Sequence, residues 1–157
     1  MSIQSGQNKS LATLRRLARL AAVQGLYQAE LSPEPLEAVI QRFHEDPSVL
    51  FSEEQAGASI DTELLMVILS GTKEHRDIVD TSLSETLGPT HSLARLEELL
   101  KAILRAGAFE ILYCLDTPEG IIVNDYVDVA HSFFAAKEPA MVNAVLDALA
   151  KKKRQPL

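Results

Sequence analysis

Three arginines at close spacing near the start of the chain are the residues best suited to recognition chemistry. At 100° per residue, Arg15, Arg16 and Arg19 share an arc of about 100° on a helix. A guanidinium group stays charged and donates two parallel hydrogen bonds to a phosphate or carboxylate. The first thirty residues contain no acidic partner for them except Glu30. The spacing predicts an exposed anion-binding face, with nucleic acid favoured over an acidic protein as the partner.

Two nearby residues extend this predicted face. Lys9 lies in the polar segment before the helix and could act as part of a flexible arm. Tyr27 falls near 120° on the same helix, at the edge of the arginine arc, where its ring could stack on a base. The alternative for Tyr27 is packing against the following helix, and for the arginines a solvated face without a partner.

Residue patterns typical of catalysis or metal binding are absent from the sequence. The four histidines, His44, His75, His91 and His131, lie far apart, and there is no glycine-rich phosphate loop or nucleophile elbow. Cys114 ends an apolar stretch and is expected to be a small core residue rather than a nucleophile. We therefore expect a protein that is not an enzyme and that has no metal and no cofactor.

Two charged residues interrupt an apolar helix. Arg105 and Glu110 lie within the predicted helix that begins after Ser92, and each would need a partner if it is buried. We interpret them as structural polar groups rather than as an acid/base pair.

The net charge of −7 conceals an uneven distribution along the 157 residues. Residues 1–30 contain four basic side chains and one acidic, residues 31–150 contain seven basic and 21 acidic, and residues 151–157 contain four basic. An acidic body between two basic ends would repel RNA except at a restricted face. The acidic total therefore does not exclude nucleic acid as a partner.

The cellular environment is indicated by what the sequence lacks. A single cysteine cannot form an internal disulfide, which fits a reducing compartment. The start is polar, and no apolar run approaches the ~20 residues of a membrane span. We expect a cytoplasmic protein that makes no contact with a membrane.

Apolar periodicity predicts six helical segments and no strand. Ser10 and Asp61 are the expected N-caps of the first and third, and Gly88-Pro89 is a strong stop signal. The fifth is rich in β-branched residues, but its charge spacing favours a helix. The predicted segments are 11–30, 36–44, 61–87 with a bend at Gly71, 92–114, 118–134 with Thr117 as cap, and 139–150.

These segments predict an all-α fold: one compact domain of six to seven helices in two three-helix sub-bundles. The sub-bundles are expected at about 10–88 and 92–150. Residues 1–9 are predicted to form a disordered arm and residues 151–157 a basic tail.

Four stretches in the right order resemble the NusB family of bacterial transcription antitermination factors. They cover most of the chain and are residues 15–28 (RRLARLAAVQGLYQ), 103–112 (ILRAGAFEIL), 122–134 (IVNDYVDVAHSFF) and 138–150 (EPAMVNAVLDALA). The resemblance implies a fold of two three-helix sub-bundles. It also implies binding to boxA RNA of ribosomal RNA leader transcripts, together with the ribosomal protein NusE, in an RNA polymerase complex that reads through terminators.

The resemblance also assigns site residues. The basic residues of the family's first helix correspond to Arg15, Arg16 and Arg19. The polar positions expected to bind a protein partner correspond to Asn124, Asp125 and Asn143, with Leu100 at a further interface position.

The sequence departs from the family pattern at several positions. Leu100 stands where a charged residue is frequent, Glu119 where an aromatic is common, Ala140 where Lys is frequent, and Met141 and Ala144 where Phe and Gly are usual. Two other functions stay open: an adaptor with this fold and little RNA affinity, and a detached domain of an RNA cytosine methyltransferase. A homodimer that covers the arginine face is also open.

Overall fold

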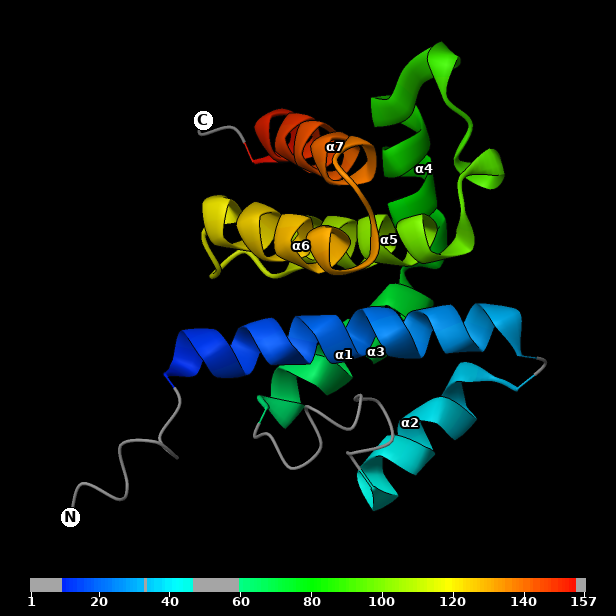
Figure 1. Ribbon diagram of the computed structural model, residues 1–157, viewed down its shortest axis with the longest axis vertical. Coiled ribbons are helices and arrows are strands. Elements are labelled where there is room, and N and C mark those ends of the chain that lie inside the picture. Colours follow the sequence, from blue (N-terminus) through cyan, green and yellow to red (C-terminus); the bar gives the residue numbers. More distant parts are fainter. Residues whose placement is uncertain (1–9, 33, 47–59, 155–157) are drawn as a thin grey trace.

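The computed structural model describes residues 10–32, 34–46 and 60–154, and these form seven α-helices, two short 3₁₀ helices and no strand (Figure 1). The all-α fold predicted from periodicity is confirmed. The α-helices are α1 (Leu11–Leu31), α2 (Leu36–Glu45), α3 (Thr62–Glu74), α4 (Arg76–Leu87), α5 (Glu98–Tyr113), α6 (Glu119–Phe133) and α7 (Lys137–Lys153); the 3₁₀ helices are η4 (Gly88–Thr90) and η5 (Leu93–Arg95).

The first helix lies across the middle of the molecule and packs on two sides. It contacts α2 and α3 on one side and α5 and α6 on the other, as Figure 1 shows. Helix α7 covers α5 and α6, and α4 contacts α5 and α7. The division into units of 10–88 and 92–150 stays a prediction.

Local capping explains where α1 and α3 begin. The Ser10 side chain accepts a hydrogen bond from Thr13 N at 3.2 Å, and Asp61 Oδ1 accepts one from Leu64 N at 3.0 Å. Each cap satisfies an amide that the helix itself leaves unpaired. Both predicted N-caps are confirmed.

The predicted single helix over 61–87 is wrong, because the chain breaks at His75. His75 has φ −106° and ψ 24°, which ends α3 and precedes α4. Its ring stacks on Tyr113, with centroids 4.1 Å apart. Gly71 does not form the bend; a Cβ there would lie 2.1 Å from Phe109 Cζ, so this glycine allows α5 to approach.

Other helix ends differ by a few residues from the prediction. Helix α5 begins at Glu98 rather than after Ser92, because residues 93–95 form a 3₁₀ turn first. Pro118, not Thr117, occupies the N-cap of α6. Helix α7 continues to Lys153, so residues 151–153 of the expected basic tail are helical.

Small side chains let α1 pack between its neighbours. Ala18, Ala21 and Ala22 are completely buried, and a Cβ on Gly25 would lie 3.0 Å from Leu69 Cδ2. Close helix contact on both sides extends the buried arc of α1 well beyond the single stripe expected from its alanines. No helix in the described part of the chain is long and apolar enough to cross a membrane.

Candidate nucleic-acid interface

The exposed cation of the predicted arginine face is Arg16. It lies in the first half of α1 and makes no hydrogen bond or salt bridge with any described residue. Its positive charge acts on the Asp125 carboxyl of α6 and favours the ionised form. Most of the hydrogen-bonding capacity of this guanidinium is therefore available to an external anion.

Arg15, the neighbour of Arg16 in the sequence, is a second cation, and it already forms a long ion pair within the protein. Its side chain is 42% exposed, and its Nε lies 3.5 Å from Asp61 Oδ2, the acid that caps α3. That Nε is buried and makes no hydrogen bond within the described residues. The pair Arg15 and Arg16 forms what we call the α1 cation pair.

Arg19 does not belong to this surface, and the prediction that it faces RNA is wrong. The residue is 0% exposed. Its Nε and Nη2 donate to the two carboxylate oxygens of Glu110, each at 2.8 Å, and its Nη1 donates to Asp125 Oδ2 at 2.8 Å. The helical wheel assumed that α1 has one buried stripe and therefore left Arg19 exposed. In the structure, α5 and α6 also pack against α1, and they cover the side on which Arg19 lies.

The buried network also includes a tyrosine. Tyr126 Oη donates to Glu110 Oε2 at 2.6 Å, so Glu110 on α5 accepts from both α1 and α6. Burial disfavours the charged form of Arg19, but the hydrogen bonds and charge of Glu110 outweigh it and hold the pKa of Arg19 above its usual value. Burial, reinforced by the charge of Glu110, raises the pKa of Tyr126 well above its usual value. The network is a charged hydrogen-bonded cluster that fixes three helices relative to one another.

The predicted partner-binding residues lie in different environments. Asn124 and Asn143 are exposed, on α6 and α7 respectively. The Asp125 side chain is 15% exposed and already accepts from Arg19. Leu100 is 5% exposed, so its side chain packs into the core; the expectation that it presents a contact to a partner is wrong.

Of the other two predicted RNA contacts, only Tyr27 lies within the described residues. Tyr27 is partly buried and packs against the hydrophobic core. It lies 11 residues after Arg16, which places it about 16 Å further along α1. Lys9 lies outside the described residues.

Sequence reasoning missed the role of Arg154. Its guanidinium donates to the carbonyl oxygens of Ile111, Cys114 and Thr117, each at 2.8 Å, and to that of Glu110 at 3.2 Å. These groups belong to the end of α5 and the connection to α6. The carbonyls of Glu110 and Cys114 also accept from the backbone N–H groups of Cys114 and Thr117, so Arg154 adds a charged donor at a helix end. A basic residue following an amphipathic helix gives little sequence signal for such a role, because it resembles a solvated tail.

The described residues offer little for catalysis. They contain no group of three or more histidine, cysteine or acidic side chains that could hold a metal ion. Burial raises the pKa of the Cys114 thiol to about 11, with the charge of Glu110 adding to the effect. The thiol is therefore protonated at neutral pH, which agrees with its interpretation as a packing residue.

Comparison with known proteins adds a family match over almost the whole chain. Residues 16–151 match the model described as "NusB family". The chain is 42% identical over 141 residues to the transcription antitermination protein NusB of Gluconobacter oxydans, which covers 88% of this chain and 87% of that protein. It is 36% identical over 155 residues to the protein of the same name from Bartonella quintana, with 97% of both chains covered.

Solved structures share the fold. The T. maritima NusB structure aligns with a TM-score of 0.71 at 25% identity, over 88% of this chain and 91% of that one. A structure described as antitermination factors NusB and NusE in complex with dsRNA aligns with a TM-score of 0.70 at 23% identity, over 89% and 98%.

Proposed function

The chain belongs to the NusB family of transcription antitermination proteins, and we propose that it binds single-stranded boxA-type RNA through the α1 cation pair, Arg15 and Arg16, together with a NusE protein. The observation that carries the RNA-binding part is the exposed Arg16 guanidinium without a salt bridge. An arginine in that state binds a phosphate oxygen without first breaking an intramolecular contact.

The acidic body supports a single RNA-binding face. The chain carries a net charge of −7, and its acidic residues lie almost entirely in the middle of the sequence. Repulsion from that region directs a polyanion toward the first half of α1. Lys9 and Tyr27 are further proposed contacts: Lys9 precedes α1 in the sequence and lies outside the described residues, and the partly buried Tyr27 ring would stack on a base through its exposed part.

Arg19 supports this face without touching RNA. Its contacts with Glu110 and Asp125 hold α1 against α5 and α6. The α1 cation pair is therefore presented from a helix fixed on both sides, which reduces the ordering cost of binding.

The proposed protein partner is NusE, within an RNA polymerase antitermination complex. Two phosphate-binding arginines give only weak, salt-sensitive binding by themselves. A second RNA-binding protein on the same strand would raise the affinity through effective concentration. The exposed amides of Asn124 and Asn143 are the proposed contacts for that partner.

One observation favours a second candidate function, an adaptor with little RNA affinity. The structure leaves two surface arginines where the sequence predicted three. The two functions differ in whether RNA binding depends on the α1 cation pair.

Titration with salt tests the proposal directly. Binding of a boxA-like RNA to this protein with NusE is measured by fluorescence anisotropy at several salt concentrations. We expect Arg15→Ala/Arg16→Ala to weaken binding and to reduce the slope of log K against log salt by about two units. The matched control, Lys152→Ala/Lys153→Ala, removes the same charge from the end of α7. Equal effects of the two double variants, or none, would reject the α1 face.

A further inference from the structure

A stack of aromatic rings reaches the surface where α3, α4 and α5 meet. The His75 ring, at the break between α3 and α4, stacks on Tyr113 of α5 with centroids 4.1 Å apart. Tyr113 in turn stacks on Phe109, with centroids 5.5 Å apart. Phe109 is almost completely buried whereas Tyr113 is exposed, so the stack leads from the core to the surface.

Two aliphatic side chains that are about half exposed border this stack. Ile78 is 55% exposed and follows His75 by three residues, which places the two side chains close together. Val67 is 43% exposed and lies one turn before Gly71, the glycine of α3 that contacts the Phe109 ring. Apolar side chains that gather at a surface mark interaction sites more often than scattered ones do. We call the set the aromatic face, and its members are Val67, His75, Ile78 and Tyr113.

The exposed charged residues beside the aromatic face are acidic. Four exposed acids of α3 and α4 make no hydrogen bond or salt bridge with any described residue, and they are Glu63, Glu74, Asp77 and Glu85. Glu63 lies one turn before Val67, on the same side of α3. Asp77 adjoins Ile78 at the start of α4, and Glu85 lies two turns further along the same side. Unpaired carboxylates therefore follow the apolar residues along both helices.

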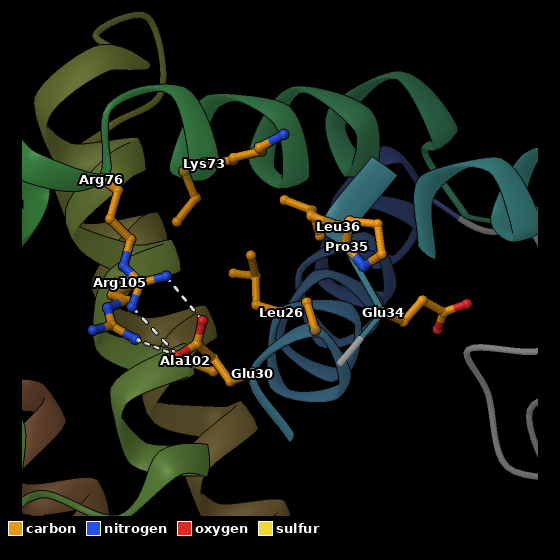
Figure 2. Close-up of a pocket in the computed structure, with 11 residues that line it drawn as sticks. Leu26, Glu30, Glu34, Pro35, Leu36, Lys73, Arg76, Ala102 and Arg105 are labelled. Carbon is orange, nitrogen blue, oxygen red and sulfur yellow. Dashed lines mark hydrogen bonds and ion pairs between the residues drawn. The ribbon is translucent and has the colours of Figure 1, made fainter. Parts of the chain in front are cut away.

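The cations of α3 and α4 lie on another side of these helices. Residues 62–87 contain only two, Lys73 and Arg76, and both line a cavity of about 320 Å³ that faces α1 and α2 (Figure 2). Arg76 donates to Glu30 of α1 at 2.8 Å, and Lys73 forms an ion pair with Glu37 of α2. The acids beside the aromatic face therefore create a negative potential, which repels RNA and attracts a basic partner.

We propose that the aromatic face binds a basic amphipathic helix of a partner protein. The apolar stripe of that helix packs on the aromatic face, and the lysines or arginines beside the stripe pair with Glu74 and Asp77. A helix fits because the apolar and acidic positions follow two successive helices lengthwise rather than surrounding one pocket. The surface uses neither residue of the α1 cation pair, so it can be tested independently of RNA binding.

NMR titration of the ¹⁵N-labelled full chain with a synthetic helix of leucine and lysine tests the proposal. Its leucines stand at i, i+3, i+4 and i+7, and we expect saturable shifts of amide signals centred on residues 67, 75, 78 and 113. A peptide of the same residues in scrambled order should bind at least about tenfold more weakly, because its leucines no longer share one face. A peptide with glutamate in place of lysine should not bind, because the acids repel it.

Loss of one apolar anchor should weaken binding of the lysine peptide. Ile78→Ser is expected to reduce the affinity about tenfold or more, because an apolar side chain in the centre of the contact is removed. Ile121→Ser is the matched control, because Ile121 is 49% exposed and lies on α6. Both positions are exposed, so both variants should fold.

Neutral substitution of the acids tests the electrostatic part. Glu74→Gln/Asp77→Asn should weaken binding of the lysine peptide and reduce its dependence on salt. Glu119→Gln/Asp128→Asn, which removes the same charge from α6, should change neither. The two pairs are matched because Asp77 and Glu119 each lie in the first turn of a helix.

Several outcomes would overturn the proposal: no saturable shifts with the lysine peptide, equal binding of the scrambled or the glutamate peptide, or equal affinities of Ile78→Ser and Ile121→Ser. Shifts of the same amides by a boxA-like RNA would assign the face to nucleic acid and would also overturn it. Arg15→Ala/Arg16→Ala should weaken RNA binding and leave peptide binding unchanged, so failure of this proposal is distinct from failure of the proposed RNA binding.

Discussion

Arg19 of α1 and Glu110 of α5 form a completely buried bidentate ion pair between residues 91 positions apart in the chain. Both oxygens of the carboxylate accept from the guanidinium, and Tyr126 donates to one of them. Because of this pair, Arg19 is not part of the surface that Arg15 and Arg16 form. It holds α1, the helix that carries those two arginines, against α5.

The first prediction separates the structural arginine from the binding arginine. Arg19→Ala should reduce the free energy of unfolding by about 3–5 kcal/mol, because Glu110 is left buried without its cation. Arg16→Ala should change stability by less than about 0.5 kcal/mol while it weakens RNA binding. Urea unfolding measures the first effect and RNA titration the second. A mild loss of stability in Arg19→Ala would contradict the burial argument.

The second prediction concerns the tyrosine of the network. Tyr126→Phe should destabilise the protein by about 1.5–3 kcal/mol, the usual contribution of a hydrogen bond to a charged group. Tyr113→Phe is the matched control, because Tyr113 is 38% exposed and its hydroxyl makes no hydrogen bond within the described residues. Thermal or urea unfolding of both variants checks this. Equal losses of unfolding free energy would show that the buried Tyr126 hydroxyl stabilises the protein no more than the exposed Tyr113 hydroxyl does.

The third prediction concerns the four-carbonyl contact of Arg154. Arg154→Ala should cost about 2 kcal/mol, because the end of α5 loses a charged donor. Hydrogen exchange should become faster at the end of α5 and the start of α6, with α1 much less affected. Lys152→Ala, which removes an exposed charge two residues earlier, should leave exchange unchanged. Uniform acceleration across the protein would argue against a local role.

The fourth prediction concerns thiol reactivity. With a pKa of about 11, about one thousandth of Cys114 is thiolate at pH 8. Alkylation of the folded protein should therefore be at least about a hundredfold slower than in urea, where the thiol regains an ordinary pKa. Labelling followed by mass spectrometry measures both rates. Comparable rates would show that the thiol is not shielded.

The fifth prediction gives the sign of a pH effect. Burial raises the pKa of Asp125, and Arg19 only partly offsets this. The folded state then holds the proton more tightly than the unfolded state, so the contribution of Asp125 to stability falls as pH rises from its ordinary value of 3.8 through the raised value. Across that window, wild type should lose stability relative to Asp125→Asn. Unfolding curves from pH 3 to pH 7 check this, and the opposite trend would contradict it.

Much of the fold is predictable from sequence because its signals are local. Ser10 and Asp61 cap helices through amides three residues away, and apolar periodicity marks each helix. The break at His75 has no glycine or proline to signal it, and the His75 ring stacks on Tyr113, a distant contact that the local sequence does not reveal.

The site is only partly predictable because burial of α1 is decided by distant helices. The helical wheel places Arg15 and Arg16 correctly on one side, but it contains no information about α5 and α6, which cover Arg19. The available signal is the charge of Glu110 within an apolar helix, which requires a buried cation from elsewhere. Matching Arg19 to Glu110 as complementary charges in apolar surroundings would have predicted the pair.

The contact of Arg154 has a consequence for the order in which the protein completes its structure during synthesis. Cys114, whose carbonyl Arg154 binds, precedes it by 40 residues. A growing chain therefore presents the end of α5 well before the guanidinium that caps it has been added. Until Arg154 has been added, the junction of α5 and α6 has only its own contacts, among them the hydrogen bond from Thr117 N to the Cys114 carbonyl at 3.1 Å. The four carbonyl contacts at this end of the molecule are therefore completed only by the residue that follows α7.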